Sequence, residues 1–303
     1  MKKLLFMLLF VALVVSFAIA KDEINPVQKR AELQAKIDAL KAEGQAKGWT
    51  FTVGVNPALQ YTLDQLCNFK PELQSYHSGN DYIKYAQKGG QWVSPTPTPT
   101  DTPTGDSYMG YWTSVKSPGG CGSAWAFSTT GAFESNLKKN GISTDLSEQW
   151  LISCNTDGWG CNGGWFANAY MVDPGAVLES CYPYTGTDST CQTGCPFVYV
   201  ASSTGNTGDD VASIKWGIVD YGAVSCAVYV NSAFQAYIGG TFNDCDDKSC
   251  NHAVILCGWD DSKGASGAWY MKNCWGTGWG EDGFMWIEYG CSNVGYGSNY
   301  IEY

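Results

Sequence analysis

The sequence predicts an α+β protein with two lobes, one mainly helical and one mainly β. Apolar residues from Ala124 to Asn140 follow a helical pattern that ends at Gly141, a residue suited to a left-handed cap. Beyond Val211 the apolar residues form short runs separated by Gly and Asp. Of the 303 residues 44% are hydrophobic, as in a globular protein. Helices in one half and strands in the other are typical of the α+β class.

The first twenty residues predict a cleavable export signal. Lys2 and Lys3 precede an apolar run over residues 4–17, and Ala18-Ile19-Ala20 supplies the small residues of a cleavage site. The alternative is an uncleaved membrane anchor, but spanning takes about 20 apolar residues. We therefore expect an exported protein, either secreted or held in a lysosome-like vacuole. In an oxidising compartment its cysteines are expected to be bridged rather than metal-bound.

Residues 21–94 predict a small, charge-balanced segment that needs a surface to pack against. Helical spacing extends over residues 24–48, and Thr62 to Gln65 matches a capping box at the start of a second, short helix. Residues 95–107 alternate Pro and Thr, which predicts an extended linker rather than a packed element. The main body then covers residues 108–303.

The β half of the main body contains five expected strands. Gly and Asp clusters separate these apolar runs, as in an antiparallel barrel or sheet. The runs cover residues 223–230, 234–242, 252–259, 268–275 and 283–289.

Charge and residue composition exclude nucleic-acid binding and argue against membrane docking and metal sites. Residues 95–303 contain 7 Lys, no Arg and 21 acidic residues, whereas nucleic-acid binding needs a basic surface. The same excess disfavours docking on an anionic membrane. With only His77 and His252 in the chain, we expect no zinc site, and the acidic loops 244–247 and 260–261 match no Ca²⁺-loop spacing. No cofactor or metal is expected.

Six short motifs carry a family resemblance. The stretch Gly119 to Ser128, GGCGSAWAFS, resembles the start of the active-site helix in papain-like cysteine peptidases (the C1 family, which includes the cathepsins). His252 and Asn273 follow Ala124 by 128 and 149 residues, as in that family. The remaining matches are Ser147-Glu-Gln149, Gly160-Cys-Asn-Gly-Gly164 and Tyr182-Pro-Tyr184. Covering about residues 112–303, the resemblance implies a papain-like fold with an active-site groove between a helical lobe and an antiparallel β-barrel lobe.

Two parts of the family's catalytic machinery are absent. The resemblance implies a thiolate nucleophile at the helix N-terminus, an imidazole oriented by an Asn, and a Gln that stabilises the oxyanion. Here Ala124 stands at the nucleophile position and Pro118 at the Gln position. Loss of a nucleophile costs about 10⁶ in turnover, so we expect a pseudopeptidase. Because Pro118 differs as well, natural loss is favoured over an engineered or misread residue.

The residues leave alternatives open. A working endopeptidase would follow if Ala124 were an engineered or misread residue, or if Cys250 or Cys274 served as nucleophile, although a buried or bridged thiol explains each cysteine better. A protein in which only the cross-linked scaffold matters is the third alternative. Ser123 is expected to be the helix N-cap.

The resemblance also implies a peptide groove and a set of disulfides. Gly163 and Gly164 would pair with an extended peptide, with Trp165, Phe166, Cys250 and Asn251 beside it, while Trp275 and Trp279 shield His252 and Asn273. The expected ligand is a peptide or protein, and the chain's own residues 21–94, which resemble a propeptide in position, are one candidate; we expect a monomer. The implied disulfides are Cys121–Cys161, Cys154–Cys191 and Cys245–Cys291, with Cys181–Cys195 as a plausible fourth; Cys67, Cys226, Cys250, Cys257 and Cys274 stay open.

Overall fold

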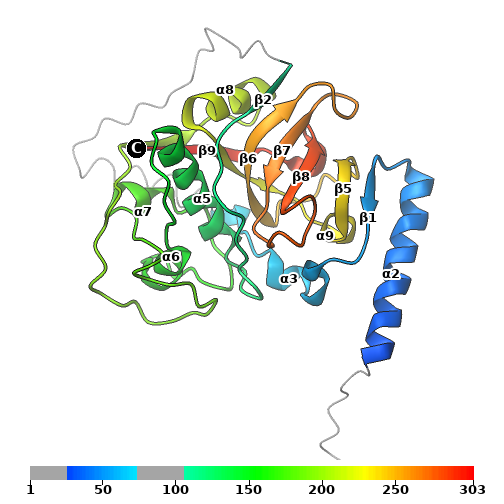
Figure 1. The fold of residues 1–303 in the computed structure, drawn as a ribbon, viewed down its shortest axis with the longest axis horizontal. Helices are drawn as coiled ribbons and strands as arrows, with labels where there is room; N and C mark the ends of the chain where they lie inside the picture. Colours follow the sequence, from blue (N-terminus) through cyan, green and yellow to red (C-terminus); the bar gives the residue numbers. More distant parts are fainter. Residues whose placement is uncertain (1–25, 74–105) are drawn as a thin grey trace, which may run out of the picture.

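The computed structural model describes residues 26–73 and 106–303, so the expected export signal and most of the Pro/Thr linker lie outside the described residues. The main body has two parts (Figure 1). Helices α5, α6 and α7 lie together on one side, and most of the strands lie on the other. Within the described residues no helix is both long and apolar enough to cross a membrane.

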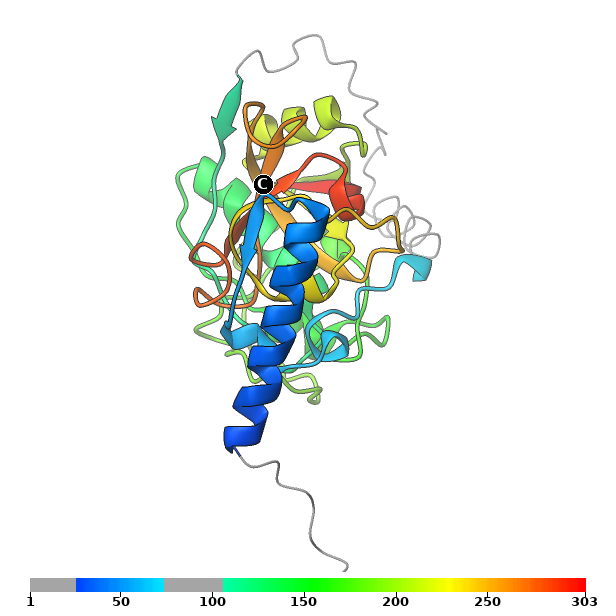
Figure 2. The same cartoon turned by 90° about the vertical axis from the view of Figure 1, so that its right-hand side faces the viewer.

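Residues 26–73, here called the N-terminal segment, pack along one edge of the β lobe. Helix α2 (Pro26–Lys47) turns back at Gly48 into strand β1 (Phe51–Val53), which pairs antiparallel with β5 (Tyr237–Phe242). Figure 2 shows α2 and β1 side by side on the outside of the body. Short helices follow: η1 (Pro57–Gln60), α3 (Leu63–Leu66) and η2 (Pro71–Leu73). The predicted helix over residues 24–48 is confirmed, as is the capping box, because Thr62 and Gln65 exchange both hydrogen bonds.

The helical lobe is centred on α5 (Ala124–Lys139), which is buried along most of its length. A Cβ at Gly131 would lie 2.4 Å from the side chain of Ile255, so glycine allows the helix to approach the sheet closely. Helices α6 (Glu148–Cys154) and α7 (Asn168–Val172) complete this lobe. Gly141, with a φ of +83°, follows the end of α5 as expected.

One sheet runs through the β lobe. Its strand order is β1-β5-β8-β7-β6-β4-β9-β3, and β2 pairs with β6. Every pairing is antiparallel except β5 with β8. The remaining elements are β2 (Ser107–Met109), β3 (Ser203–Asn206), α8 (Val211–Tyr221), β4 (Val224–Val228), α9 (Ser232–Gln235), β6 (His252–Asp260), β7 (Ala268–Lys272), β8 (Phe284–Glu288), η3 (Cys291–Asn293) and β9 (Tyr296–Glu302).

The α+β class agrees with the structure, and three of the five expected β runs match strands β4, β6 and β8. The other two runs need correction, and some elements were missed. Residues 234–242 are not one strand, because Asn231 caps the short helix α9 before β5 begins. The run expected over 268–275 ends at Lys272, where the chain turns at Asn273. The prediction missed helix α8, which Asp210 caps, and strand β9, whose Gly-, Ser- and Asn-containing sequence lacks the expected alternation.

Four disulfides join the expected pairs: Cys121–Cys161, Cys154–Cys191, Cys181–Cys195 and Cys245–Cys291. The five other cysteines, left open by the sequence, are free and buried. Cys121–Cys161 matters most for the groove, because it joins the loop before α5 to the loop that contains Gly163 and Gly164.

Candidate functional site

The chain enters α5 through a glycine-rich turn. Gly119 has a φ of +62°, and Ala124 is the first helical residue, with its methyl group buried. Pro118, at the predicted oxyanion position, has no amide hydrogen to donate; its carbonyl accepts a hydrogen bond from the Tyr184 hydroxyl at 3.0 Å. Ser123 stands at the N-cap position of α5, as expected, but its side chain makes no cap hydrogen bond; its hydroxyl lies 3.2 Å from the Tyr184 hydroxyl.

His252 and Asn273 form a buried hydrogen-bonded pair. His252 is the first residue of β6, and Asn273 directly follows β7, which pairs with β6. The imidazole Nε2 lies 2.8 Å from Asn273 Oδ1, and the Trp275 ring centroid lies 4.9 Å from that of His252. Trp279 packs in turn against Trp275 at 5.3 Å. The structure thus brings together all four residues, from two chain segments.

Burial governs the chemistry of this imidazole. Loss of hydration lowers the pKa of His252 to about 4, and the hydrogen bond to Asn273 opposes that shift only in part. Nδ1 has no hydrogen-bond partner among the described residues. At neutral pH the ring is therefore an uncharged imidazole, with Nε2–H donated to Asn273 and a free lone pair on Nδ1.

The two alternative nucleophiles do not have the character of activated thiols. Burial raises the pKa of Cys250 and of Cys274 to about 12 each. A reactive thiol needs a lowered pKa, so both are almost wholly protonated at pH 7. Cys250 also precedes the start of β6, so it does not lie on the strand that contains His252.

The predicted peptide-binding residues surround a piece of the chain itself. Phe69 pairs in parallel with Gly164, its N–H donates to Asn251 O at 2.9 Å, and the N–H of Lys70 donates to Gly164 O at 3.1 Å. The Phe69 ring centroid lies 4.8 Å from each of the rings of Trp165 and Phe166. Residues 68–70 therefore occupy the groove with main-chain pairing and an aromatic anchor.

Gly163 permits this close contact. Its φ is +102°, and a Cβ there would lie 1.9 Å from the carbonyl oxygen of Asn68. A Cβ at Gly122 would lie 2.8 Å from the Asn68 side chain, so the N-terminal segment also covers the turn before α5. Sequence reasoning missed Asn68 and Phe69, because nothing in their local pattern marks a contact with residues about 95 positions further on.

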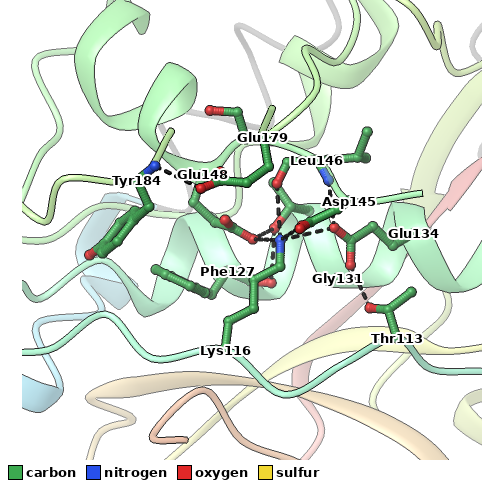
Figure 3. Close-up of polar contacts among 12 residues, drawn as sticks. Thr113, Lys116, Phe127, Gly131, Glu134, Asp145, Leu146, Glu148, Glu179 and Tyr184 are labelled. Atoms are coloured by element: carbon green, nitrogen blue, oxygen red, sulfur yellow. Dashed lines mark hydrogen bonds and ion pairs between the residues drawn. The ribbon is translucent and has the colours of Figure 1, made fainter. Parts of the chain in front are cut away.

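A cluster of charges, in which Glu134 and Glu148 are buried and Asp145 is exposed, surrounds the Lys116 ammonium (Figure 3). The ammonium of Lys116 forms ion pairs with Glu148 at 2.7 Å, Asp145 at 2.6 Å and Glu134 at 3.1 Å. Burial alone would lower the pKa of Lys116, but Glu148 and Glu134 raise it. Burial raises the pKa of Glu148 to about 7, against the pull of Lys116. Only Glu148 of this cluster lies in a motif that the sequence singled out.

The described residues contain no group of three or more His, Cys, Asp or Glu side chains that could hold a metal ion. The chemistry available at the site is thus that of main-chain pairing, aromatic packing and one neutral imidazole.

Comparisons with known proteins agree with this site. Residues 97–301 match the sequence model of a family described as "Papain family cysteine protease". Cathepsin L of Sarcophaga peregrina is 38% identical over 57% of this chain and 54% of its own length. Digestive cysteine proteinase 1 of Homarus americanus is 36% identical over 67% of each chain. The chain therefore spans a little over half to two thirds of the length of these relatives.

Two solved structures align with more than nine tenths of this chain, so the match includes its N-terminal segment. The structure of digestive procathepsin L 3 from Tenebrio molitor larval midgut matches with a TM-score of 0.72 at 27% identity, over 93% of this chain and 95% of that one. A recombinant stem bromelain precursor matches with a TM-score of 0.76 at 25% identity, over 98% of each chain. Both of these proteins are precursor forms by name.

Proposed function

Because this chain belongs to the papain family of cysteine proteases, we propose that it is an inactive member that binds an extended peptide in the ancestral groove. The observation that carries the proposal is the first residue of α5. Ala124 has no atom that could attack a carbonyl, while the His252–Asn273 pair that would serve a thiol is in place. Pro118 also supplies no oxyanion donor.

The groove supports binding because it already holds a peptide. Phe69 combines two main-chain contacts with an aromatic pocket, and its neighbour Asn68 fits against Gly163. In this proposal residues 21–94 are a propeptide-like segment that occupies the groove as an internal ligand. An external ligand with an aromatic residue at the matching place then competes with Phe69. Without a nucleophile the chain cannot release the segment by cutting itself.

Export fits the same proposal. Residues 1–20 have the features of a signal peptide, and relatives are named cathepsins or digestive proteinases. We place the protein outside the cell or in a lysosome-like vacuole, where its four disulfides are stable.

Restoring the lost atoms tests the missing chemistry. We expect the natural chain to hydrolyse no fluorogenic peptide and to take up no thiol-directed epoxide. Ala124→Cys should bind the epoxide, and adding Pro118→Gln should raise its peptide hydrolysis by about 10² to 10³, the worth of one oxyanion donor. The matched control is Pro118→Gln alone, which should stay inert. Epoxide-sensitive hydrolysis by the natural chain would show that it is a working endopeptidase.

Binding is tested separately. Phe69→Ala should free the pocket, so that an uncleavable peptide with one aromatic residue binds more tightly than to the natural chain, as measured by fluorescence anisotropy. Val27→Ala, an exposed change on α2, is the control and should leave the affinity unchanged. If the natural chain, Phe69→Ala and Val27→Ala all bound the peptide equally and negligibly, the groove would have no binding function. A purely structural role for the cross-linked scaffold would then remain.

A further inference from the structure

A small cavity lies between the two lobes, behind the His252–Asn273 pair. About 20 Å³ of it is open to the centre of a water molecule, and one buried water needs about 10–15 Å³. Three parts of the chain line this cavity: the loop before α5, helix α5 with the start of α6, and strands β6 and β7 with the residues that follow β7. The lining residues are Lys116, Phe127, Ser128, Gly131, Glu134, Glu148, Ala253, Val254, Ile255, Lys272, Asn273 and Cys274.

Most polar atoms of this lining are paired within the protein. Glu134 accepts from Lys116 and from the N–H of Leu146 through Oε1, and from the Thr113 hydroxyl through Oε2. Glu148 Oε1 accepts from Lys116 and from the Thr130 hydroxyl, both at 2.7 Å. Figure 3 shows the carboxylates turned toward the Lys116 ammonium.

Three groups keep unused hydrogen-bonding capacity. Glu148 Oε2 has no partner among the described residues, although Glu148 is only 1% exposed. Asn273 Nδ2 likewise has no acceptor among them, while its Oδ1 accepts from His252 and from the N–H of Cys274. The buried ammonium of Lys272 has three N–H donors and one acceptor among the described residues, the Thr113 hydroxyl at 3.2 Å.

We infer that the cavity binds an ordered water molecule that donates to Glu148 and accepts from Lys272 and Asn273. Buried polar groups are almost always paired, and cavities that stay dry are lined by apolar groups. Water supplies both functions at once, since it donates two hydrogen bonds and accepts two. A metal cation is disfavoured by the two ammonium groups of the lining, and an anion by its two carboxylates.

Through Asn273, this water links the charge cluster around Lys116 to the His252 imidazole. If Nδ2 of Asn273 is held by the water, the side-chain amide cannot rotate, and Oδ1 stays directed at His252 Nε2–H. Lys272 and Glu148 are thus positioning residues: they act on His252 only through the water and Asn273.

The full-length protein provides a direct test. In a high-resolution crystal structure we expect a water within hydrogen-bonding distance of Glu148 Oε2, Lys272 Nζ and Asn273 Nδ2. In solution the Asn273 side-chain amide protons should show a nuclear Overhauser effect to a long-lived water. A dry cavity, or an ion in it, overturns the proposal. A water that contacts only Glu148 and Lys272 overturns the link to Asn273.

A matched pair of variants tests the positioning role. Lys272→Met removes one donor to the water, so the Overhauser effect should be lost and the His252 ring nitrogen resonances should shift. Lys215→Met removes another buried lysine, whose partner is Asp261 outside the cavity, and should change neither signal. Retention of both signals in a folded Lys272→Met protein contradicts the role of Lys272. If Lys272→Met fails to fold, the crystal structure and the Overhauser measurement on the natural chain still decide whether the cavity contains the water.

Discussion

At the scale of single residues, the environment of His252 is set by burial rather than by a partner charge. In an active papain-like site an imidazolium is stabilised by the neighbouring thiolate. Here a methyl group at position 124 offers no such charge, so desolvation dominates and the neutral ring is favoured. In the inactive member that we propose, the absence of one sulfur atom would both remove the nucleophile and leave the neighbouring imidazole uncharged.

Titration of the two histidines checks this effect. We expect the His252 ring to stay neutral until the pH falls to about 4, as followed by NMR of the imidazole resonances. A His77→Gln variant assigns the two signals, since the chain has no other histidine. Ala124→Cys should raise the His252 pKa, because a thiolate nearby favours the charged ring. A natural-chain pKa of 6.5 or more would contradict the burial argument.

At the scale of elements, the N-terminal segment contacts the main body along most of its length. Strand β1 extends the sheet beside β5, and residues 68–70 lie along the groove. Lys47 and the Trp49 indole both contact Asp244 on the main body just before β1. Between β1 and residues 68–70, the Asn56 side chain donates to Gln235 O, and the Gln235 side chain donates to Ala58 O. An exposed ion pair such as Lys47–Asp244 contributes at most about 1 kcal/mol. The buried contacts of the segment, those of Phe51 and Phe69 among them, therefore hold it more strongly.

Gly163→Ala should displace residues 68–70 from the groove. Its new Cβ would meet the Asn68 carbonyl oxygen at 1.9 Å, and backbone atoms on both sides leave little room to adjust. We expect faster proteolysis and faster hydrogen exchange in the N-terminal segment. Gly158→Ala is the control: it also has a positive φ, +76°, but a Cβ there has nothing within 4 Å. Equal protection of the segment in both variants would show that the contact at Gly163 does not hold it.

At the scale of the whole molecule, buried charges join the two lobes. Lys116 connects the loop before α5 with α5 itself and with the start of α6. In the same loop, the Thr113 hydroxyl accepts from Lys272 of β7 and donates to Glu134 of α5. Such clusters are costly to break, because removal of one partner leaves the others buried and unpaired. The lobes are thus tied together behind the groove.

This cluster should make stability depend on pH. The folded pKa of Glu148 is about 7, against 4.5 for a free side chain, so between these values the folded chain holds a proton that the unfolded chain has lost. The contribution of Glu148 to the free energy of unfolding therefore falls as pH rises from about 4.5 to about 7, by at most about 1.4 kcal/mol per pH unit. His252 acts oppositely, since its contribution rises with pH between about 4 and 6.5.

Chemical denaturation of Glu148→Gln at several pH values separates the two effects. The stability of the natural chain minus that of the variant should decrease as pH rises through this window. Glu32→Gln, an exposed change on α2, should show a constant difference instead. A Glu148→Gln difference that stays flat or increases with pH would contradict a raised Glu148 pKa.

Much of this molecule could be predicted from local patterns. The helix over residues 24–48, the capping box at Thr62, most of the β runs and the class of fold depend on contacts between near neighbours in the chain. The motifs around Ala124, His252 and Asn273 identified the family because their order and spacing are specific. Helix α8 and strand β9 were missed, since tertiary packing outweighs their weak local patterns.

The sequence by itself determined the family, the class of fold and the absence of a sulfur atom at position 124, because each is a property of residue identity and order. Only the tertiary structure decided what fills the groove and what surrounds His252. Phe69 meets Gly164 and Trp165, and Lys116 meets Glu148, only after the chain has folded. Contacts between distant residues, and the burial that shifts a pKa, arise from packing, and no local pattern encodes them.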